Sequence, residues 1–563
     1  MPDSFFERPF PLGHKQVEGR FVIPSGIRCT HASTIARCFR DVPPVGIVTT
    51  KSLSLAPRAG YREPIYARYA PGSYINAVGL ANPGAEAFRT EYENFETPAN
   101  KFLLVSIFGS GVDDFTGAAR HLTPIADGFE LNMSCPHVKG HGAEIGEDTD
   151  LVVAVLRSVM AQKDIPVFVK VSATLPGLVR TVKACVAAGA AGITVTNSIG
   201  PAIVSVGEDP ILYNRRGGLS GDAIRPLGQR AVEQVREAIG DTPVIIGMGG
   251  VGTAEHVRQF RKAGADLFGI GSAVTGMDST AMKAYFGALQ DQLTGHDAAT
   301  PPAPEVDMTY FETRIAARHQ YCPGLFKIEF ERLPADYGPG ELGGKYLFLT
   351  VPGVGEKPFA IFSAAERTII VRTVGVFTKY LEEASIGSRI LLRGPYGATL
   401  PAYKRRQVVM VGGGTGTASL LGIAQHYAPD NDLHFVFGAR TAAEFYDLDR
   451  FAPLGPVHLA TDDGSAGYHG LVSGQLERLL ASAIPHDQLA FINCGPGPMV
   501  HACHKIQRQY VSSDSILSSI EYMTSCGVGI CGKCASPSGA LTCIDGPFLP
   551  ASEFAWPATP RTS

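Results

Sequence analysis

Four cysteines near the carboxyl end of the chain have the spacing of a redox cluster. Cys526, Cys531 and Cys534 follow a C-x4-C-x2-C pattern, and Cys543 comes soon after them. This pattern is typical of plant-type [2Fe–2S] sites, in which four thiolates bind two irons. A structural zinc site uses the same ligands but usually arranges them as two C-x2-C pairs. We therefore predict a [2Fe–2S] cluster, with zinc as the alternative.

A fifth cysteine, Cys135, lies in the polar stretch NMSCPH, directly after the apolar run GFELN. A lone cysteine is most often an inert core residue. Here, however, amides, amines and a hydroxyl also follow other predicted strands, which favours a pocket for a small polar ring. His137 is either a loop histidine or a ligand contact. The polar set consists of Lys51, Asn76, Asn132, Lys170, Asn197 and Ser198.

Three glycine-rich turns in the first half of the chain could meet around one phosphate. They are GGLSG (217–221), GMGGVG (247–252) and GIGSAV (269–274). Backbone amides and helix N-termini in such turns bind phosphate groups. The three turns together predict a phosphorylated cofactor, whereas one alone would be read as structural.

A further glycine-rich turn, VVMVGGGTGTASLL, stands between a predicted strand and helix in the second half. The pattern suits a pyrophosphate but also occurs as a purely structural turn. The stretch CGPGPM (494–499), at the end of a later strand, could present its backbone to a nicotinamide. Lys357 and the segment 375–378 are weaker candidates for a flavin site. The glycines of the turn are Gly412, Gly413, Gly414 and Gly416.

The elements that must position these residues fall into two kinds. Up to about residue 295, short apolar runs alternate with helical stretches, which predicts a parallel (β/α)8 TIM barrel. The expected strands are 44–50, 101–108, 128–132, 166–171, 192–196, 243–248 and 266–271, with 73–78 as a weaker candidate.

After the barrel, a segment rich in proline and alanine predicts an extended linker. Short alternating runs then predict a small antiparallel β-barrel, and strand–turn–helix units predict a second α/β domain. The expected division is a barrel at 1–296, a linker at 297–307, a β-barrel at 308–402, a nucleotide-binding α/β domain at 403–512 and a cluster domain at 513–563.

Composition narrows the functional classes. The chain has 563 residues and a formal net charge of −4, which does not predict a nucleic-acid or anionic-membrane surface. The start MPDSFFERPFPLG lacks the features of a secretory signal. We therefore expect a soluble cytoplasmic protein of several domains.

The first ~295 residues resemble dihydroorotate dehydrogenase. The resemblance rests on TKSLSL, NAVGLANPG, NMSCPH, VKVS, TNSIG, GGLSG, IIGMGGV and GIGSA, in this order. The remainder resembles the electron-transfer subunit of that enzyme, of the ferredoxin-reductase type, through KPFAI, VGVFT, VGGGTG, TDDGSAGYHG, CGPGPM and the four cysteines. The chain departs from the family at His137, where asparagine is usual.

The resemblance implies FMN in the barrel, and FAD, [2Fe–2S] and NAD in the second half. It makes Cys135 the catalytic base and Lys170 a partner of the flavin. The implied substrate contacts are Lys51, Asn76, Gly79, Leu80, Asn132, His137, Asn197 and Ser198. The implied FMN contacts are Ser25, Gly26, Lys51, Lys170, Ser220, Gly221, Gly249, Gly250, Gly271 and Ser272. The implied FAD contacts are Lys357, Pro358, Phe359, Ala360, Gly375 and Thr378.

The implied reaction is oxidation of dihydroorotate to orotate, with electrons passing through [2Fe–2S] and FAD to NAD+, in a homodimer formed through the barrel. A dihydrouracil dehydrogenase is one alternative, because SCPH also occurs in that family. A flavoenzyme acting on another ring is a second. A scaffold with a zinc-bound tail and no catalytic activity is a third, from a different class.

Overall fold

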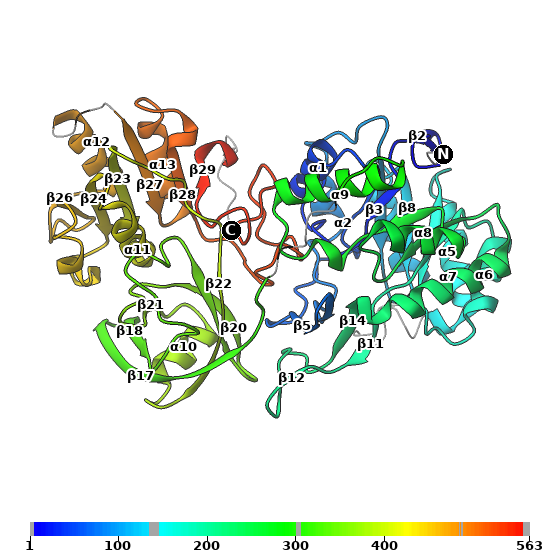
Figure 1. Cartoon of the computed structure of the whole chain (residues 1–563), viewed down its shortest axis with the longest axis horizontal. Coiled ribbons are helices and arrows are strands. Elements are labelled where there is room, and N and C mark those ends of the chain that lie inside the picture. The colour runs from blue at the N-terminus through cyan, green and yellow to red at the C-terminus, as the bar shows by residue number, and fades with distance from the viewer. Residues whose placement is uncertain are drawn as a thin grey trace. The chain divides into compact units, whose positions relative to one another are not determined.

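The computed structural model describes residues 5–133, 146–299, 304, 306–482, 485 and 488–554 (Figure 1). The chain divides into two compact units. Unit 1 comprises Met1–Val306 together with Val528–Ala535, and unit 2 comprises Asp307–Gly527 together with Ser536–Ser563. Among the described residues, no helix is both long enough and apolar enough to cross a lipid bilayer.

Unit 1 is built around a closed barrel of eight parallel strands, which confirms the predicted barrel fold. The order of the strands around the barrel follows their order in the sequence. Nearly all of their residues are buried, because each strand faces the packed interior on one side and helices on the other. The strands are β3 (Phe21–Ile23), β4 (Val45–Thr49), β7 (Phe102–Ile107), β8 (Gly128–Asn132), β9 (Val167–Val171), β10 (Gly192–Val195), β15 (Val244–Met248) and β16 (Leu267–Gly269).

Helices surround this barrel, as the blue-to-green ribbon of Figure 1 shows. α5 (Thr149–Met160) is representative: Asp148 caps its first turn, and Val152, Val155, Leu156 and Val159 form its buried stripe. This spacing places the four side chains on one helix face. The other helices are α1 (Ala32–Asp41), α2 (Ala85–Tyr92), α3 (Val112–Leu122), α6 (Leu178–Ala187), α7 (Arg225–Ile239), α8 (Ala254–Lys262) and α9 (Ser279–Leu293).

One barrel strand differs from the sequence prediction. The weaker candidate at 73–78 forms β6 (Ser73–Asn76), which belongs to a separate antiparallel sheet and not to the barrel. The eighth barrel strand is instead β3, whose short apolar run FVI lies directly between Arg20 and Pro24. The separate sheet has the order β11 (Ile199–Ala202), β14 (Gly217–Gly221), β6, β5 (Tyr66–Ala70). Two short pairs complete the unit, β1 (Phe10–Leu12) with β2 (Lys15–Val17) and β12 (Ser205–Val206) with β13 (Asp209–Pro210).

Unit 2 begins with an antiparallel sheet of six strands. Its order leaves β20 and β21 at the edges, so that the expected β-barrel is open between these two strands in the part of the chain that the structure describes. The sheet, in order, is β20 (Gly355–Ala360), β19 (Tyr346–Val351), β22 (Arg389–Tyr396), β17 (Phe311–Cys322), β18 (Leu325–Phe330) and β21 (Thr368–Arg372), and α10 (Val376–Glu383) follows β21.

The rest of unit 2 contains a seven-stranded sheet whose central strands are parallel, as the α/β prediction requires. Its last strand pairs antiparallel to its neighbour. The sheet, in order, is β26 (Tyr468–His469), β25 (Val457–Thr461), β24 (Asp432–Ala439), β23 (Gln407–Gly413), β27 (Leu489–Cys494), β28 (Ile516–Ser519) and β29 (Leu549–Pro550), with helices α11 (Ala418–Tyr427), α12 (Val472–Ser482) and α13 (Gly497–Gln507). The finer domain boundaries stay predictions.

Candidate active site

A pocket opens at the carboxyl ends of the barrel strands in unit 1. Every described residue of unit 1 that the sequence singled out as a substrate or FMN contact lines it. Cys135 and His137 lie outside the described residues. The lining residues that were predicted are Ser25, Gly26, Lys51, Asn76, Gly79, Leu80, Asn132, Lys170, Asn197, Ser198, Ser220, Gly221, Gly249, Gly250, Gly271 and Ser272.

Strand register explains why the key polar residues meet. Asn132 ends β8 and pairs with Lys170 on β9, and Asn197 follows β10. Parallel barrel strands end on the same face, so residues at neighbouring strand ends become neighbours in space. Lys170 is 4% exposed and Asn132 is 6% exposed. The ammonium group of Lys170 and the amide of Asn132 are therefore largely shielded from water.

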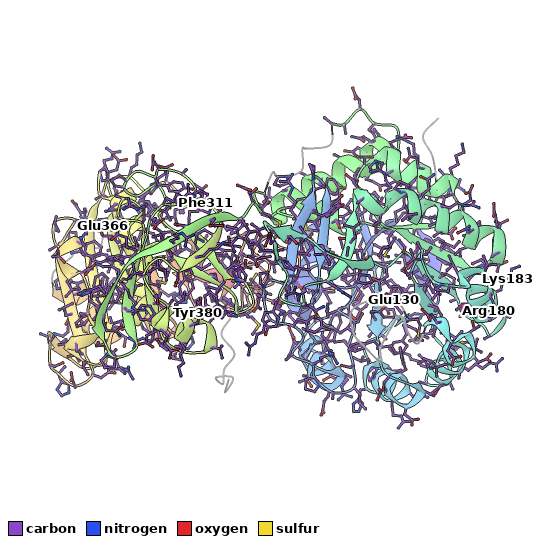
Figure 2. The ribbon with its side chains drawn as sticks, turned by 90° about the horizontal axis from the view of Figure 1, so that it is seen from below. Glu130, Arg180, Lys183, Phe311, Glu366 and Tyr380 are labelled. Carbon is purple, nitrogen blue, oxygen red and sulfur yellow. The ribbon has the colours of Figure 1, made fainter. Side chains whose placement is uncertain are left out.

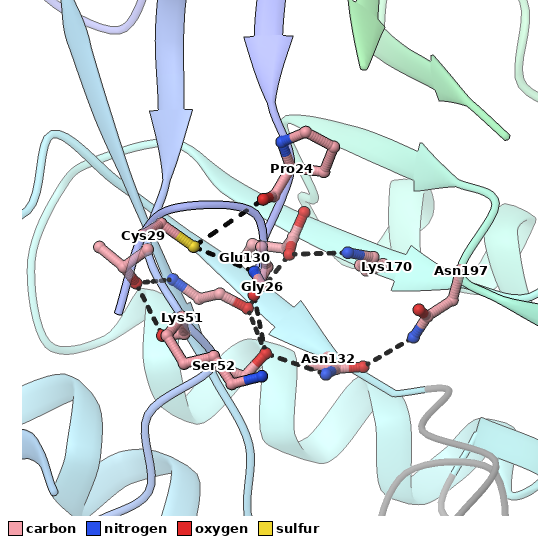
Figure 3. A network of polar contacts seen from close by, with 12 residues as sticks. Pro24, Gly26, Cys29, Lys51, Ser52, Glu130, Asn132, Lys170 and Asn197 are labelled. Atoms are coloured by element: carbon pink, nitrogen blue, oxygen red, sulfur yellow. Dashed lines mark hydrogen bonds and ion pairs between the residues drawn. The ribbon is translucent and has the colours of Figure 1, made fainter. Parts of the chain in front are cut away.

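These groups belong to a buried polar network that begins at Glu130, in the middle of β8 (Figure 3). Glu130 lies inside unit 1, whereas Arg180 and Lys183 of α6 lie on its outer side (Figure 2). The Glu130 Oε1 atom is 3.6 Å from Lys170 Nζ and accepts a hydrogen bond of 3.1 Å from Ser106 Oγ. A carboxylate in an otherwise apolar strand is a recognisable signal, but the sequence reasoning did not single it out.

The network continues from Ser106 to the predicted substrate contacts. The hydroxyls of Ser52 and Ser106 are 3.0 Å apart, and Asn132 Nδ2 donates to Ser52 Oγ at 3.0 Å. Asn197 Nδ2 in turn donates to Asn132 Oδ1 at 3.3 Å, and the hydroxyl of Ser25 is 3.1 Å from that of Ser52. One connected set of hydrogen bonds thus reaches the β3–α1 loop and two strand ends.

Cys29 lies beside this network in the β3–α1 loop. Its Sγ accepts a hydrogen bond of 3.0 Å from the backbone N–H of Gly26. Burial raises the pKa of the Cys29 thiol to about 11, although the charge of Lys51 opposes this shift. Cys29 is therefore a neutral thiol near neutral pH, and it stabilises the loop that carries Ser25 and Gly26.

The glycine turns lie where two backbone segments pack so closely that a side chain would not fit between them. Gly221, Gly249 and Gly250 have φ values of +85°, +110° and +81°. A Cβ added to Gly250 would stand 2.8 Å from the carbonyl oxygen of Gly221. Two of the three predicted turns therefore pack directly on each other. The third contributes Ser272, whose hydroxyl donates to that of Ser220 at 3.2 Å.

Another wall of the pocket carries Gly79 and Leu80, and Asn82 holds these residues in place. Leu80 has a φ of +57°, which is unfavourable for a branched side chain. The amide nitrogen of Asn82 donates to the Leu80 carbonyl at 2.9 Å, and its oxygen accepts from the N–H groups of Ser54 and Gly84. These bonds offset the backbone strain and fix the amides of this loop.

The pocket also receives residues from the far end of the chain. Ile530 and Cys531, in the segment Val528–Ala535 of unit 1, are among the lining residues. The backbone N–H of Arg28 donates to the Ile530 carbonyl at 2.8 Å, and Thr30 Oγ1 donates to the Cys531 carbonyl at 2.6 Å. No local sequence signal predicted this, because the partners are about 500 positions apart.

The four clustered cysteines are all buried. Cys531 and Cys534 belong to unit 1, and Cys526 and Cys543 belong to unit 2. Within the residues that the structure describes, no three histidine, cysteine, aspartate or glutamate side chains form a group that could hold a metal ion. The [2Fe–2S] assignment therefore stays a prediction.

In unit 2 the two predicted nicotinamide elements, the glycine turn and the stretch CGPGPM (494–499), lie in contact. The glycine turn follows β23, and a Cβ added to Gly416 would stand 2.4 Å from the carbonyl oxygen of Cys494, at the end of β27.

Among the predicted flavin contacts, Thr378 Oγ1 accepts hydrogen bonds from the N–H groups of Val374 and Gly375 at the start of α10. The other predicted flavin contacts, Lys357, Pro358, Phe359 and Ala360, lie on β20.

Comparison with known proteins identifies relatives of the part of the chain that forms the barrel. The family model described as dihydroorotate dehydrogenase matches residues 12–293. The catalytic subunit of dihydroorotate dehydrogenase B (NAD(+)) from Pyrococcus horikoshii is 37% identical over 46% of this chain and 83% of its own length. The same subunit from Methanothermobacter thermautotrophicus is 37% identical over 48% of this chain and 88% of its own length.

Among solved structures, a ligand-free dihydroorotate dehydrogenase from Eimeria tenella aligns with 52% of this chain and 87% of its own, at 17% identity and a TM-score of 0.44. The match of the family model covers the whole barrel, from the β1–β2 pair to the end of α9. The chain is therefore an oxidoreductase that belongs to the dihydroorotate dehydrogenase family.

Proposed function

We propose that this protein oxidises dihydroorotate to orotate in the barrel pocket and transfers the electrons to NAD+. The observation that carries the proposal is the pocket itself, which brings Lys51, Lys170, Asn76, Asn132 and Asn197 together in a chain of this family. Two cationic side chains and three amides suit a small ring that carries carbonyl groups and a carboxylate.

The residues present fit FMN in this pocket. Gly221, Gly249 and Gly250 line the pocket together with Ser272, so backbone groups and a hydroxyl are available to a phosphate there. Lys170 would lie against the flavin and stabilise negative charge on it. Bound there, FMN would accept the hydride that the substrate ring loses.

The substrate must also lose a proton from the ring carbon next to the one that loses the hydride. We propose Cys135, which lies three residues after the end of β8, as the general base. A thiolate can take this role where neighbouring cations lower its pKa. Lys51 and Lys170, which both line the pocket, are the candidate cations.

The choice of dihydroorotate over dihydrouracil rests on the carboxylate. A buried carboxylate without a partner is costly, so a pocket for dihydroorotate must supply donors or a cation. Lys51 and the backbone amides at Gly79 and Leu80 line the pocket and can do so. The named relatives are also dihydroorotate dehydrogenases.

Unit 2 is proposed to carry the electrons away from the barrel. Its antiparallel sheet would bind FAD, its glycine turn after β23 would bind NAD+, and the four cysteines would hold a [2Fe–2S] cluster. The spacing of the four cysteines supports the cluster, and all four thiols are buried. The homodimer expected through the barrel is part of the same proposal.

Cofactor analysis and flavin bleaching test the proposal together. Protein purified without oxygen should contain FMN and FAD in equal amounts and about two irons per chain. Dihydroorotate should bleach the FMN absorbance in the absence of NAD+. Zinc in place of iron would contradict the cluster, and a flavin that dihydroorotate leaves oxidised would contradict the substrate.

A further inference from the structure

Glu130 is a carboxylate in the middle of barrel strand β8, and the proposed chemistry gives it no role. Its side chain is fully buried and forms an ion pair of 3.6 Å with Lys170. Among the described residues, its Oε2 atom has no hydrogen-bond partner. Apolar residues can often replace a buried ion pair without loss of stability. Stability alone therefore does not account for a carboxylate at this position.

The carboxylate gives the hydrogen-bond chain a fixed direction (Figure 3). An ionised carboxylate only accepts, so Ser106 must use its single hydroxyl proton on Glu130. Ser106 then accepts from Ser52, whose own proton is used in that bond. Ser52 must in turn accept from both Ser25 and Asn132.

This direction matches the orientation of two side-chain amides in the pocket. Asn132 directs its nitrogen to Ser52, which leaves its oxygen to accept from Asn197 Nδ2. The Asn197 oxygen then accepts from the backbone N–H of Ser198 at 2.9 Å. The Ser198 N–H can only donate, so it fixes the Asn197 oxygen from the other end of the chain. The carboxylate fixes the hydroxyl protons of Ser106 and Ser52, and without it these protons could point the other way.

We infer that Glu130 is a positioning residue for the reaction. It balances the charge of Lys170 beside the flavin, and through Ser106 it commits Ser52 to accept the hydrogen bond that holds Asn132 in the pocket. The inference rests on the proposed function, because it places FMN and the substrate in this pocket.

The two effects can be separated by two substitutions. Glu130→Gln keeps the size of the side chain but removes its negative charge, so it should raise the reduction potential of the bound FMN, since a negative charge beside the flavin disfavours the reduced anion. It should also weaken orotate binding about tenfold, the usual effect of losing one hydrogen bond to a charged group. Ser106→Ala leaves the ion pair and breaks the chain, so it should weaken orotate binding alone.

Asp127→Asn is the matched control. Asp127 directly precedes β8 and forms an ion pair of 2.8 Å with Lys15, at the opposite end of the strand from the pocket. This substitution also removes a carboxylate that pairs with a lysine. It should lower thermal stability and change neither the flavin potential nor the orotate affinity.

The measurements are a redox titration of the flavin without substrate and an orotate titration followed by the flavin spectrum. Flavin-loaded Glu130→Gln protein with the potential and orotate affinity of the wild type would overturn the inference. A shift of the potential in Ser106→Ala as large as that in Glu130→Gln would also overturn it. Wild-type protein without FMN would defeat the proposed function and this inference together.

Discussion

At the level of single residues, the pocket combines groups that have different tasks. Lys170 is a buried cation that is paired with Glu130, and Asn132 and Asn197 are oriented amides. None of these groups can readily accept a proton near neutral pH. The proposal therefore assigns removal of the proton to Cys135, which follows Asn132 by three positions.

The first prediction concerns this base. Cys135→Ala should slow FMN reduction by dihydroorotate about 10²–10⁴-fold, the usual contribution of a positioned base. Orotate should still bind, because the lysine and asparagine contacts remain. Rapid-mixing spectroscopy of flavin bleaching measures the rate. A rate within a few-fold of the wild type would mean that another group takes the proton.

At the level of elements, the sequence predicted most strands of both units and the residues at their ends. Seven of the barrel strands match expected runs, because buried parallel strands read as continuous apolar runs between helical stretches. β3 was missed because its apolar run, FVI, is bounded at once by Arg20 and Pro24 and precedes the first helix. The place of Ile530 and Cys531 in the pocket could not be predicted, since contacts at such sequence separation leave no local pattern.

The hydrogen-bond network of the pocket could not be predicted from the sequence either. The chain that joins Glu130 to Asn197 depends on the register of β7, β8 and β9. A shift of one residue would turn Glu130 toward the helices. Sequence patterns indicate which residues end a strand, whereas the direction of a hydrogen bond follows only from the assembled barrel.

The second prediction concerns His504, on α13 of unit 2. His504 is 1% exposed, and its Nε2 is 2.7 Å from Ser518 Oγ on β28. Burial lowers its pKa from 6.5 to about 4, and the charges of Arg508 and His501 add to this shift. The unfolded chain therefore binds the proton more readily, so stability is fully present above pH 6.5 and falls as the pH decreases toward 4.

The loss should approach about 3 kcal/mol in the free energy of unfolding of unit 2. Urea denaturation at a series of pH values measures it. His504→Gln, which cannot take up the proton, is the comparison that isolates this group, because all other titrations are shared. Parallel pH profiles for the two proteins would show that His504 does not contribute.

At the level of the whole molecule, the proposal assigns oxidation of the substrate to unit 1 and reduction of NAD+ to unit 2. The segment Val528–Ala535 belongs to unit 1 although its flanking residues belong to unit 2. It carries two of the four clustered cysteines, and one of them lines the barrel pocket.

The third prediction follows from this division. Cys531→Ser should lose iron and NAD+ reduction, yet its FMN should still be reduced by dihydroorotate. The matched control is Cys503→Ser, because Cys503 is a buried cysteine of α13 outside the cluster. Iron analysis and the two half-reactions measured separately distinguish the outcomes. Retention of iron and of NAD+ reduction in Cys531→Ser would exclude it as a ligand.

The central claim is that the barrel pocket recognises dihydroorotate and that its electrons reach NAD+. The most direct measurement compares kcat/KM for dihydroorotate and dihydrouracil in NAD+ reduction by the purified protein. A site built to pair a carboxylate should favour dihydroorotate by about 10⁴-fold or more. A preference for dihydrouracil, or no NAD+ reduction with either compound, would contradict the account.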